Sequence, residues 1–177
     1  MFYTPMFYSW MESPTGKLLL AADDSGLRQV LFADGRQPAE PRPDWKEDAA
    51  PLRETMHQLR AWFAGELREF DLRLAPEGPE FHQRVWRELC TIPFGATISY
   101  GELAQRIGSP KASRAVGRAN GANPIPIVIP CHRVIGANGK LTGYGGGIAR
   151  KEFLLALERR QLALAFHASN ALAQSTG

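Results

Sequence analysis

The sequence has little cysteine, with only Cys90 and Cys131 among its 177 residues. Two cysteines are too few for the disulfide framework of a small secreted domain, so we expect reduced thiols in an intracellular protein. The four histidines are scattered along the chain, and none belongs to a Cys/His cluster with the spacing of a zinc site. We therefore expect no bound metal.

The sequence also lacks a long apolar run. No stretch approaches the roughly 18 apolar residues that a membrane-spanning helix needs. Met1 to Trp10 has no basic region ahead of an apolar segment, so a secretory signal is not expected either. These absences predict a protein without a membrane partner.

Acidic residues are scarce in the second half of the chain. Residues 79–177 carry twelve Lys/Arg against five Asp/Glu, a formal charge of +7, whereas residues 1–78 carry nine against thirteen, a formal charge of −4. A basic half beside an acidic half favours a polyanionic partner, most simply nucleic acid, although a solvated basic face would give the same counts.

Residues 1–78 predict a small N-terminal lobe of an α/β (α+β) protein. Turn residues separate three β-rich segments, and a helical pattern follows from Pro51 to Gly65, so we expect an antiparallel sheet covered by a helix with Gln58 on its solvated side. The expected strands are 6–11, 17–22 and 27–32. The proline-rich stretch 35–50 is typical of an exposed loop without regular structure. We assign this lobe a structural role.

Residues 79–177 predict a second, mainly helical lobe. An amphipathic helix contains Phe81, Val85 and Leu89, and Cys90 at its end is expected to pack in the core. The segment Ala149 to Arg160 predicts a further helix.

Between these helices the signals favour a helix-turn-helix. Ser99 and Glu102 form a capping-box pattern for one helix, and Gly108 ends it. Ser109 and Pro110 then begin another helix, which runs to about residue 120. Two helices joined by so short a turn are typical of a DNA-binding motif.

The second of these helices is slim. It carries small residues at Ser113, Ala115 and Gly117, and Arg114 and Arg118 lie four apart on one face. A slim helix can bring its backbone close to the minor groove of DNA, although small residues also serve tight helix packing. The charge asymmetry favours DNA.

Cys131 ends an apolar run, Pro-Ile-Pro-Ile-Val-Ile-Pro-Cys-His-Arg-Val, over residues 124–134. Residues 125–129 predict a short buried strand, and Pro130 stops its pairing, so Cys131 is expected where a core element reaches the surface. A lone cysteine is usually a small buried hydrophobe, but the polar His132 and Arg133 beside it favour a nucleophile. Neighbours in extended chain point to opposite faces, so His132 needs a bridging water or a local turn to reach the sulfur.

The Pro130–Arg133 motif and its flanks resemble the active site of the 6-O-alkylguanine-DNA alkyltransferases, the methylated-DNA–protein-cysteine methyltransferases. The resemblance runs from about Phe81 to Glu158, whereas the first 78 residues match only in general character. Its further motifs are Ser99-Tyr100, Arg114-Ala115-Val116-Gly117, Asn120-Gly121-Ala122-Asn123-Pro124, Gly143-Tyr144-Gly145-Gly146-Gly147 and Lys151-Glu152-Phe153-Leu154-Leu155.

The resemblance implies DNA repair by direct, irreversible, single-turnover transfer of an alkyl group to Cys131. The group would come from the 6-oxygen of guanine, or from the 4-oxygen of thymine, in duplex DNA. The protein is itself the acceptor, so no cofactor is implied. The expected partner is double-stranded DNA with alkylated bases, bound by a monomer with cooperativity along DNA left open. The expected location is cytoplasmic, and nucleoid-associated in a prokaryote.

The resemblance also implies residue roles. Arg114 would fill the stack left by a flipped nucleotide, Tyr100 would rotate that nucleotide and contact its base, and Glu158 would orient His132 as the base for Cys131. Asn123 would link the second helix of the helix-turn-helix to the active-site segment. Without the resemblance, we would interpret Asn123 as a turn residue and Glu158 as a solvated helix residue. The expected DNA-binding residues are Tyr100, Ser113, Arg114, Ala115, Gly117 and Arg118, and the expected base pocket is Tyr100, Val134, Tyr144, Gly145 and Gly146.

Gly145 departs from the family pattern, which often has a hydroxyl residue there. One side-chain hydrogen bond to the base is therefore expected to be missing, and the pocket to be roomier.

Two alternatives belong to other functional classes. A cysteine hydrolase would also pair Cys131 with a histidine, normally one from elsewhere in the chain. A DNA-binding regulator or damage sensor would use the helix-turn-helix without transfer chemistry. The damage sensors of this family lack the acceptor cysteine, which is present here.

Overall fold

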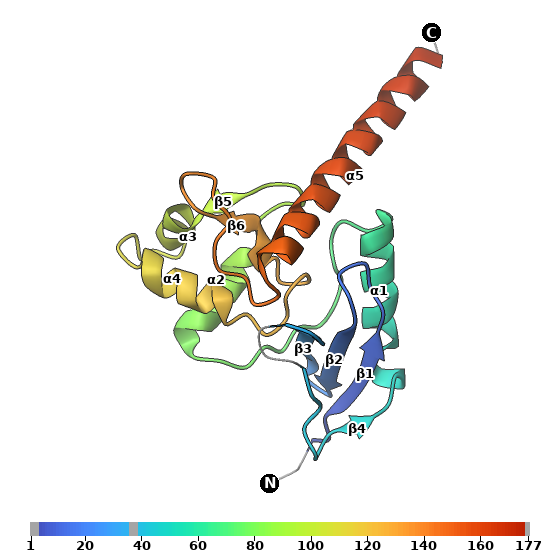
Figure 1. The fold of residues 1–177 in the computed structure, drawn as a ribbon, viewed down its shortest axis with the longest axis vertical. Helices are drawn as coiled ribbons and strands as arrows, with labels where there is room; N and C mark the ends of the chain where they lie inside the picture. Colours follow the sequence, from blue (N-terminus) through green and yellow to red (C-terminus); the bar gives the residue numbers. More distant parts are fainter. Residues whose placement is uncertain (1–3, 36–38, 176–177) are drawn as a thin grey trace.

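In the computed structural model, which describes residues 4–35 and 39–175, the N-terminal part forms a four-stranded sheet in the order β3-β2-β1-β4 (Figure 1). The strands β1 (Phe7–Met11), β2 (Leu18–Asp23) and β3 (Gly26–Phe32) pair antiparallel and lie within one residue of the predicted segments. The turns between them use Gly16 and Gly26, both with positive φ. The prediction of this meander is confirmed.

The sheet is mixed, which corrects the expectation of a purely antiparallel one. A short strand, β4 (Lys46–Glu47), pairs parallel with β1, and Lys46 N donates to Met6 O at 2.9 Å. The open edge of β1 offers unpaired backbone groups, and the proline-rich stretch supplies partners for them. That stretch is therefore not wholly irregular, and Ala39 is buried; residues 36–38 lie outside the described part.

Helix α1 (Arg53–Ala64) follows a 3₁₀ turn, η1 (Ala50–Leu52), and lies beside the sheet (Figure 1). It ends at Gly65, whose left-handed φ of +82° is the expected stop signal. Its Trp62 side chain is fully buried. Gln58 is buried rather than solvated, because its amide makes two hydrogen bonds with the backbone of Asp71, at 2.8 and 2.9 Å.

The C-terminal part contains α2 (Glu80–Leu89), α3 (Tyr100–Arg106) and α4 (Ser113–Gly121). A two-stranded parallel sheet joins β5 (Ile98–Ser99) to β6 (Val134–Ile135). The Ser99 hydroxyl accepts from Glu102 N at 3.0 Å, so the predicted cap of α3 is present, and Gly108 has the expected positive φ.

Two details of this lobe differ from expectation. Residues 109–112 form a turn closed by Ala112 N donating to Ser109 O, so α4 starts at Ser113 rather than directly after Pro110. Cys90 is exposed instead of packed in the core, because α2 ends there and turns its Val85, Trp86 and Leu89 side inward.

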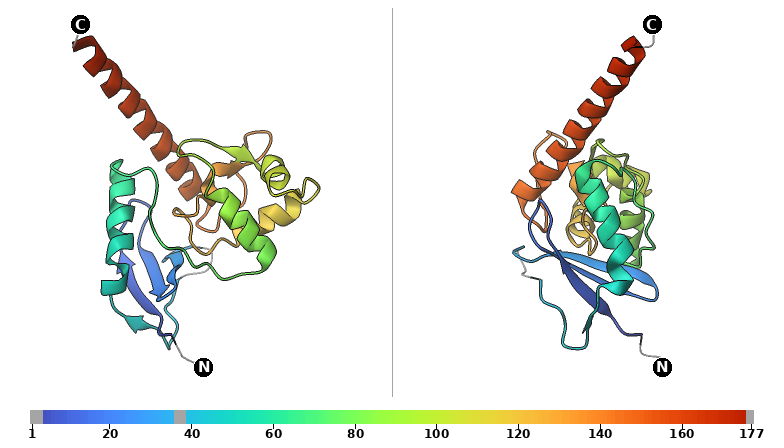
Figure 2. Two further views of the ribbon diagram at one scale, coloured as in Figure 1. Left: turned by 180° about the vertical axis from the view of Figure 1, so that it is seen from behind. Right: turned by 90° about the vertical axis from the view of Figure 1, so that its right-hand side faces the viewer.

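Helix α5 (Ile148–Ser175) is longer than the predicted segment. Its first part packs between the two lobes and buries Lys151, Leu154 and Glu158, whereas its end extends away from the body (Figures 1 and 2). One continuous apolar core runs through both lobes, from Leu20 and Trp62 to Trp86, Val116 and Cys131. None of the helices in the described ranges is both long and apolar enough to cross a membrane.

Candidate active site

The segment before Cys131 is a buried tight turn, and the predicted strand over residues 125–129 is absent. Ile129 N donates to Ile125 O at 2.9 Å, and Ile127 adopts a φ of +76°. The side chain of Asn123 closes the turn: its Nδ2 donates to Ile129 O at 2.8 Å, and its Oδ1 accepts from Ile125 N at 3.0 Å. Pro126 lacks a backbone N–H, so a continuous ladder is unfavourable and the turn replaces it.

Cys131 opens the 3₁₀ turn η2 (Cys131–Arg133) and is 4% exposed. It lies on the wall of a cavity of about 520 Å³ between the two lobes. The other lining residues are Val30, Leu31, Phe32 and Gly35 from the N-terminal lobe, and Asn120, Gly121, Ala122, Asn123, Pro124, Pro126, Gly143, Tyr144, Gly145 and Gly146 from the C-terminal lobe. The thiol therefore sits at a concave site that both lobes build.

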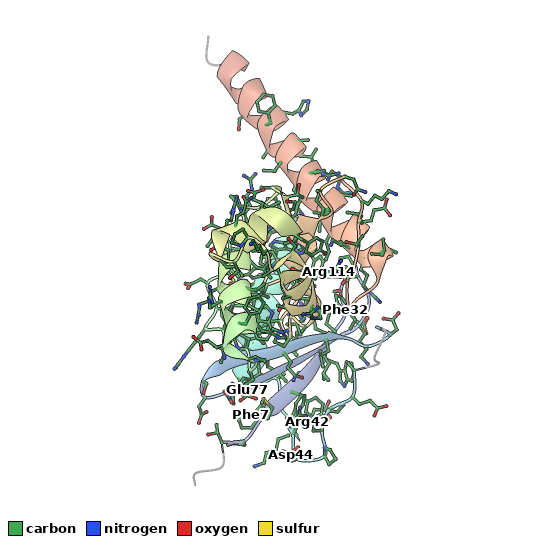
Figure 3. The ribbon with its side chains drawn as sticks, turned by 90° about the vertical axis from the view of Figure 1, so that its left-hand side faces the viewer. Phe7, Phe32, Arg42, Asp44, Glu77 and Arg114 are labelled. Atoms are coloured by element: carbon green, nitrogen blue, oxygen red, sulfur yellow. The ribbon has the colours of Figure 1, made fainter. Side chains whose placement is uncertain are left out.

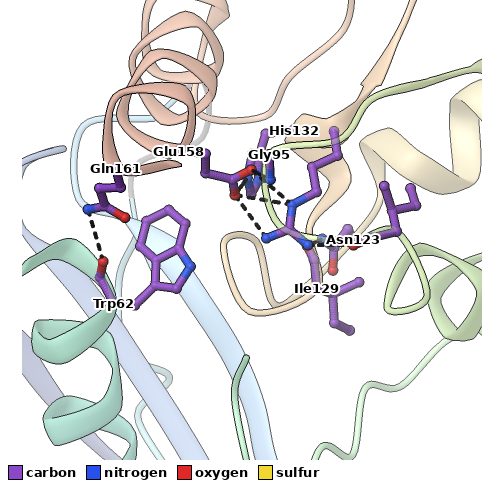
Figure 4. Close-up of polar contacts among 9 residues, drawn as sticks. Trp62, Gly95, Asn123, Ile129, His132, Glu158 and Gln161 are labelled. Atoms are coloured by element: carbon purple, nitrogen blue, oxygen red, sulfur yellow. Dashed lines mark hydrogen bonds and ion pairs between the residues drawn. The ribbon is translucent and has the colours of Figure 1, made fainter. Parts of the chain in front are cut away.

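His132, which follows Cys131 in the chain, forms a fully buried pair with Glu158 (Figure 4). The Nε2 of His132 lies 2.8 Å from Glu158 Oε1. Arg133 donates to both carboxylate oxygens at 2.9 to 3.2 Å, and Gly95 N donates to Oε2 at 2.8 Å. Arg133 also donates to Ile92 O at 2.6 Å. Its contacts are thus with a carboxylate and a carbonyl, both within the C-terminal lobe.

The protonation states of this pair follow from its surroundings. Burial would raise the pKa of Glu158, but hydrogen bonds from His132 and Arg133 outweigh it and lower the pKa, so the carboxylate is ionised at neutral pH. Burial lowers the pKa of His132 against the pull of Glu158, so the imidazole is neutral. Because the carboxylate can only accept, Nε2 carries the proton and Nδ1 has a free lone pair. No described residue hydrogen-bonds to Nδ1, which is also buried.

Burial raises the pKa of the Cys131 thiol to about 11, against the opposing effects of the Asn123 amide and the Lys151 charge. At pH 7 about one part in ten thousand is thiolate. This is far below the few per cent of a free cysteine, so the resting thiol is protonated and a nearby base is needed to activate it.

Lys151 is a buried cation beside the site that the sequence reasoning did not single out. Its Nζ donates to Thr142 O at 2.9 Å and lies 3.4 Å from the Tyr100 hydroxyl, which itself donates to Thr142 O at 3.0 Å. Lys151 lies one heptad before Glu158, so the helical period places both residues on the same face, and that spacing was the signal available in the sequence. Lys151 and Tyr100 thereby hold the chain just before the glycine-rich loop.

The glycine-rich loop, Gly143 to Gly147, forms one side of the cavity. Tyr144 is buried, and its hydroxyl has no hydrogen-bond partner among the described residues. A Cβ on Gly145 would meet nothing within 4 Å, whereas a Cβ on Gly146 would lie 2.7 Å from the Phe32 ring. Val134 and Tyr100, which were expected in the base pocket, are not among the cavity-lining residues; Val134 is fully buried in β6.

Helix α4 presents two arginines outward. Arg114 and Arg118 are exposed, Val116 and Ala119 are buried, and the intervening Ser113, Ala115 and Gly117 are half-buried. A Cβ on Gly117 would lie 3.8 Å from the Tyr100 ring. The buried Asn120, which sequence reasoning treated only as part of a motif, donates to Cys131 O at 3.3 Å, so α4 is tied directly to the active-site turn.

Comparisons with known proteins identify the same protein family for the N-terminal part and for the C-terminal part of the chain. The profile described as "6-O-methylguanine DNA methyltransferase, DNA binding domain" matches residues 80–160, and the one described as "6-O-methylguanine DNA methyltransferase, ribonuclease-like domain" matches residues 6–76. A methylated-DNA–protein-cysteine methyltransferase of Methanosarcina acetivorans is 57% identical over 153 residues, which cover 86% of this chain and 98% of that protein. One of Mycolicibacterium paratuberculosis is 57% identical over 154 residues, covering 86% and 92%.

Solved structures agree. The crystal structure of the Mycobacterium tuberculosis O6-methylguanine methyltransferase matches with a TM-score of 0.82 and 53% identity, covering 88% of this chain and 94% of that one. A structure of the Mycobacterium tuberculosis protein in complex with DNA matches with the same TM-score, the same coverage and 52% identity. The chain therefore belongs to the 6-O-methylguanine DNA methyltransferase family.

Proposed function

We propose that this chain repairs alkylated DNA by taking the alkyl group onto Cys131. Direct transfer from DNA to a protein cysteine is the activity of its family, and DNA is its partner. The observation that carries the choice of Cys131 is its position on the cavity wall, next in the chain to His132 of the buried His132–Glu158 pair. Cys90 is exposed at the end of α2 and does not line this cavity.

The transfer needs no external reagent. The Nδ1 lone pair of His132 takes the thiol proton through a bridging water, and ionised Glu158 stabilises the resulting imidazolium. The sulfur then attacks the alkyl carbon; the S–C bond forms as the C–O bond breaks, and the electron pair stays on the guanine oxygen. The proton passes to the guanine ring, so the net change exchanges the thiol hydrogen for the alkyl group. A thioether is not hydrolysed under mild conditions, so each molecule acts once.

Access to the base requires that the nucleotide leave the helix. Extruding a base costs about a few kcal/mol, and less when its pairing is already damaged. We assign the minor-groove contact to Arg114, Arg118 and the small residues of α4, and the rotation of the nucleotide to Tyr100. The exposed arginines of α4 and the short distance from Gly117 to the Tyr100 ring support this assignment.

The remaining assignments concern the whole protein. We propose that residues 79–177 carry DNA binding and chemistry, that the protein acts in the cytoplasm as a monomer, and that Asn123 holds the active-site turn. Its two hydrogen bonds across that turn support the last point.

Gly145 extends the proposal to the substrate range. The open space around its Cα supports a pocket that accepts larger guanine adducts and the 4-oxygen of alkylated thymine. Transfer rates for methyl, benzyl and larger guanine adducts test this. A steep loss of rate with adduct size in the wild type would contradict it.

The deciding experiment is intact mass and peptide mapping after mixing the protein with a duplex that contains one 6-O-methylguanine. An unmodified duplex and Cys131→Ala serve as controls. We expect a stoichiometric gain of one methyl group on the peptide containing Cys131, with guanine restored. Lesion binding without mass gain would indicate a damage sensor, and turnover of an activated ester that depends on Cys131 would indicate a hydrolase.

A further inference from the structure

We propose that contacts between the N-terminal lobe and the glycine-rich loop set the substrate range of the site: Arg150, in the first turn of α5, ties the loop to that lobe, and Phe32, at the end of β3, limits the size of the adduct that the cavity accepts. The inference rests on the proposed function, and it gives the N-terminal lobe a part in specificity beyond the structural role that its sequence indicated.

Arg150 joins three separate segments at one guanidinium group. Its Nε donates to Thr15 O at 2.7 Å, in the turn between β1 and β2, and its Nη1 donates to Gly146 O at 2.8 Å, in the glycine-rich loop. Its Nη2 binds the Asp34 carboxylate. Asp34 is exposed, so that ion pair is worth little, and the two carbonyl contacts are the ones that fix geometry. The planar fork of the guanidinium presents separate donors in fixed directions to the two carbonyls, a geometry that the single ammonium group of a lysine does not reproduce.

The position of Arg150 in α5 supports a role for these contacts, because an arginine there does not stabilise the helix itself. It lies in the first turn of α5, which has no acidic residue there. A cation at a helix N-terminus is unfavourable because it opposes the helix dipole. The helix therefore gains nothing from an arginine at this position, and the bridge from loop to lobe accounts for it.

Phe32 is a residue of the N-terminal lobe that packs against the glycine-rich loop. It is 6% exposed at the end of β3, and Figure 3 places it at the junction between the sheet and the helical lobe. Its ring centroid lies 6.0 Å from that of Tyr144, and the Arg150 guanidinium lies 4.8 Å above it. A Cβ on Gly146 would collide with it at 2.7 Å. The Phe32 ring therefore leaves no room for a side chain at residue 146.

These contacts make Phe32 a packed wall of the cavity. Phe32, Tyr144, Gly146 and Cys131 all line the same space. An alkyl group presented to the Cys131 sulfur shares that space with the ring, and a packed wall rejects extra volume more strongly than it rejects a methyl group. Loosening Arg150 would let the loop drift, and misplacing a reacting group by about 1 Å can cost on the order of a hundredfold in rate.

The test measures the rate constants for transfer to Cys131 from duplexes carrying 6-O-methylguanine and 6-O-benzylguanine. The variants are Phe32→Ala, Phe32→Leu, Arg150→Met and Arg150→Lys, with Arg53→Met, an exposed arginine of α1, as the matched control. We expect Phe32→Ala to raise the benzyl-to-methyl rate ratio about tenfold and Phe32→Leu to raise it less. Arg150→Met should lower the methyl rate at least about tenfold while lesion affinity stays within about twofold, and Arg150→Lys should not restore it.

The outcomes separate the two proposals. If the wild type transfers nothing to Cys131, the proposed function fails and this inference fails with it. If the wild type transfers the methyl group, but folded Phe32→Ala keeps the wild-type benzyl-to-methyl ratio or folded Arg150→Met keeps the wild-type methyl rate, the inference is overturned and the proposed function stands. A purely structural role would lower both rates by one factor, and melting temperatures measured alongside would show the matching loss of stability.

Discussion

At the scale of single residues, the active site depends most on Glu158, which accepts from His132, Arg133 and Gly95 in a fully buried position. In Glu158→Gln, Arg133 is left without a carboxylate and the His132 imidazolium loses its stabilising charge. We expect the unfolding free energy to fall by about 3–5 kcal/mol, since breaking a buried pair strands a charge. We also expect the methyl-transfer rate to fall at least about a hundredfold. Urea denaturation and single-turnover kinetics measure the two effects.

Glu152→Gln, an exposed change on the same helix, is the control for Glu158→Gln. It should leave both quantities near the wild-type values. Loss of stability without loss of rate in Glu158→Gln would remove Glu158 from the proposed proton path and leave it a structural role.

His132 predicts how stability depends on pH. Burial holds its folded-state pKa below 6.5, so the unfolded chain binds the imidazole proton first as pH falls. Its contribution is present above 6.5 and is lost as pH decreases from there toward the folded pKa. We expect the unfolding free energy to decrease between pH 7.5 and 5.5, and to decrease less in His132→Asn. Equal slopes for the two proteins would show that His132 is not buried in its neutral form.

At the scale of elements, the turn over residues 125–129 holds Cys131 in place, and Asn123 closes it with one donor and one acceptor. Asn123→Ala removes both bonds and leaves Ile129 O buried without this partner, at a cost of about 1–3 kcal/mol. Asn123→Asp keeps the acceptor for Ile125 N but loses the donor. We expect the transfer rate to fall at least about tenfold in both variants, with the smaller loss of stability in Asn123→Asp. A wild-type rate in Asn123→Ala would show that the turn needs no closure.

The same elements show what the sequence can and cannot predict. Predictions of helix ends from local sequence were correct at Ser99 and Gly65. The Ser99 cap of α3 and the end of α1 at Gly65 depend only on backbone hydrogen bonding and on φ. The predicted strand at 125–129 was wrong because an apolar β-branched run satisfies a buried turn as well as a buried strand. Gln58 and Cys90 were misplaced because their exposure depends on partners and helix ends that only the tertiary structure supplies.

At the scale of the whole molecule, the two lobes differ in charge, +7 against −4, and the arginines of α4 are exposed on the basic lobe. Each phosphate contact contributes about 0.9 to the slope of log affinity against log salt concentration. We therefore expect the affinity of Cys131→Ala for a lesion duplex to fall steeply between 50 and 200 mM NaCl. Adding Arg118→Ala should reduce that slope by about one, whereas adding Arg60→Ala, an exposed change on the acidic lobe, should leave it unchanged. Fluorescence anisotropy measures both slopes. Equal slopes in all three proteins would mean that DNA does not lie along α4.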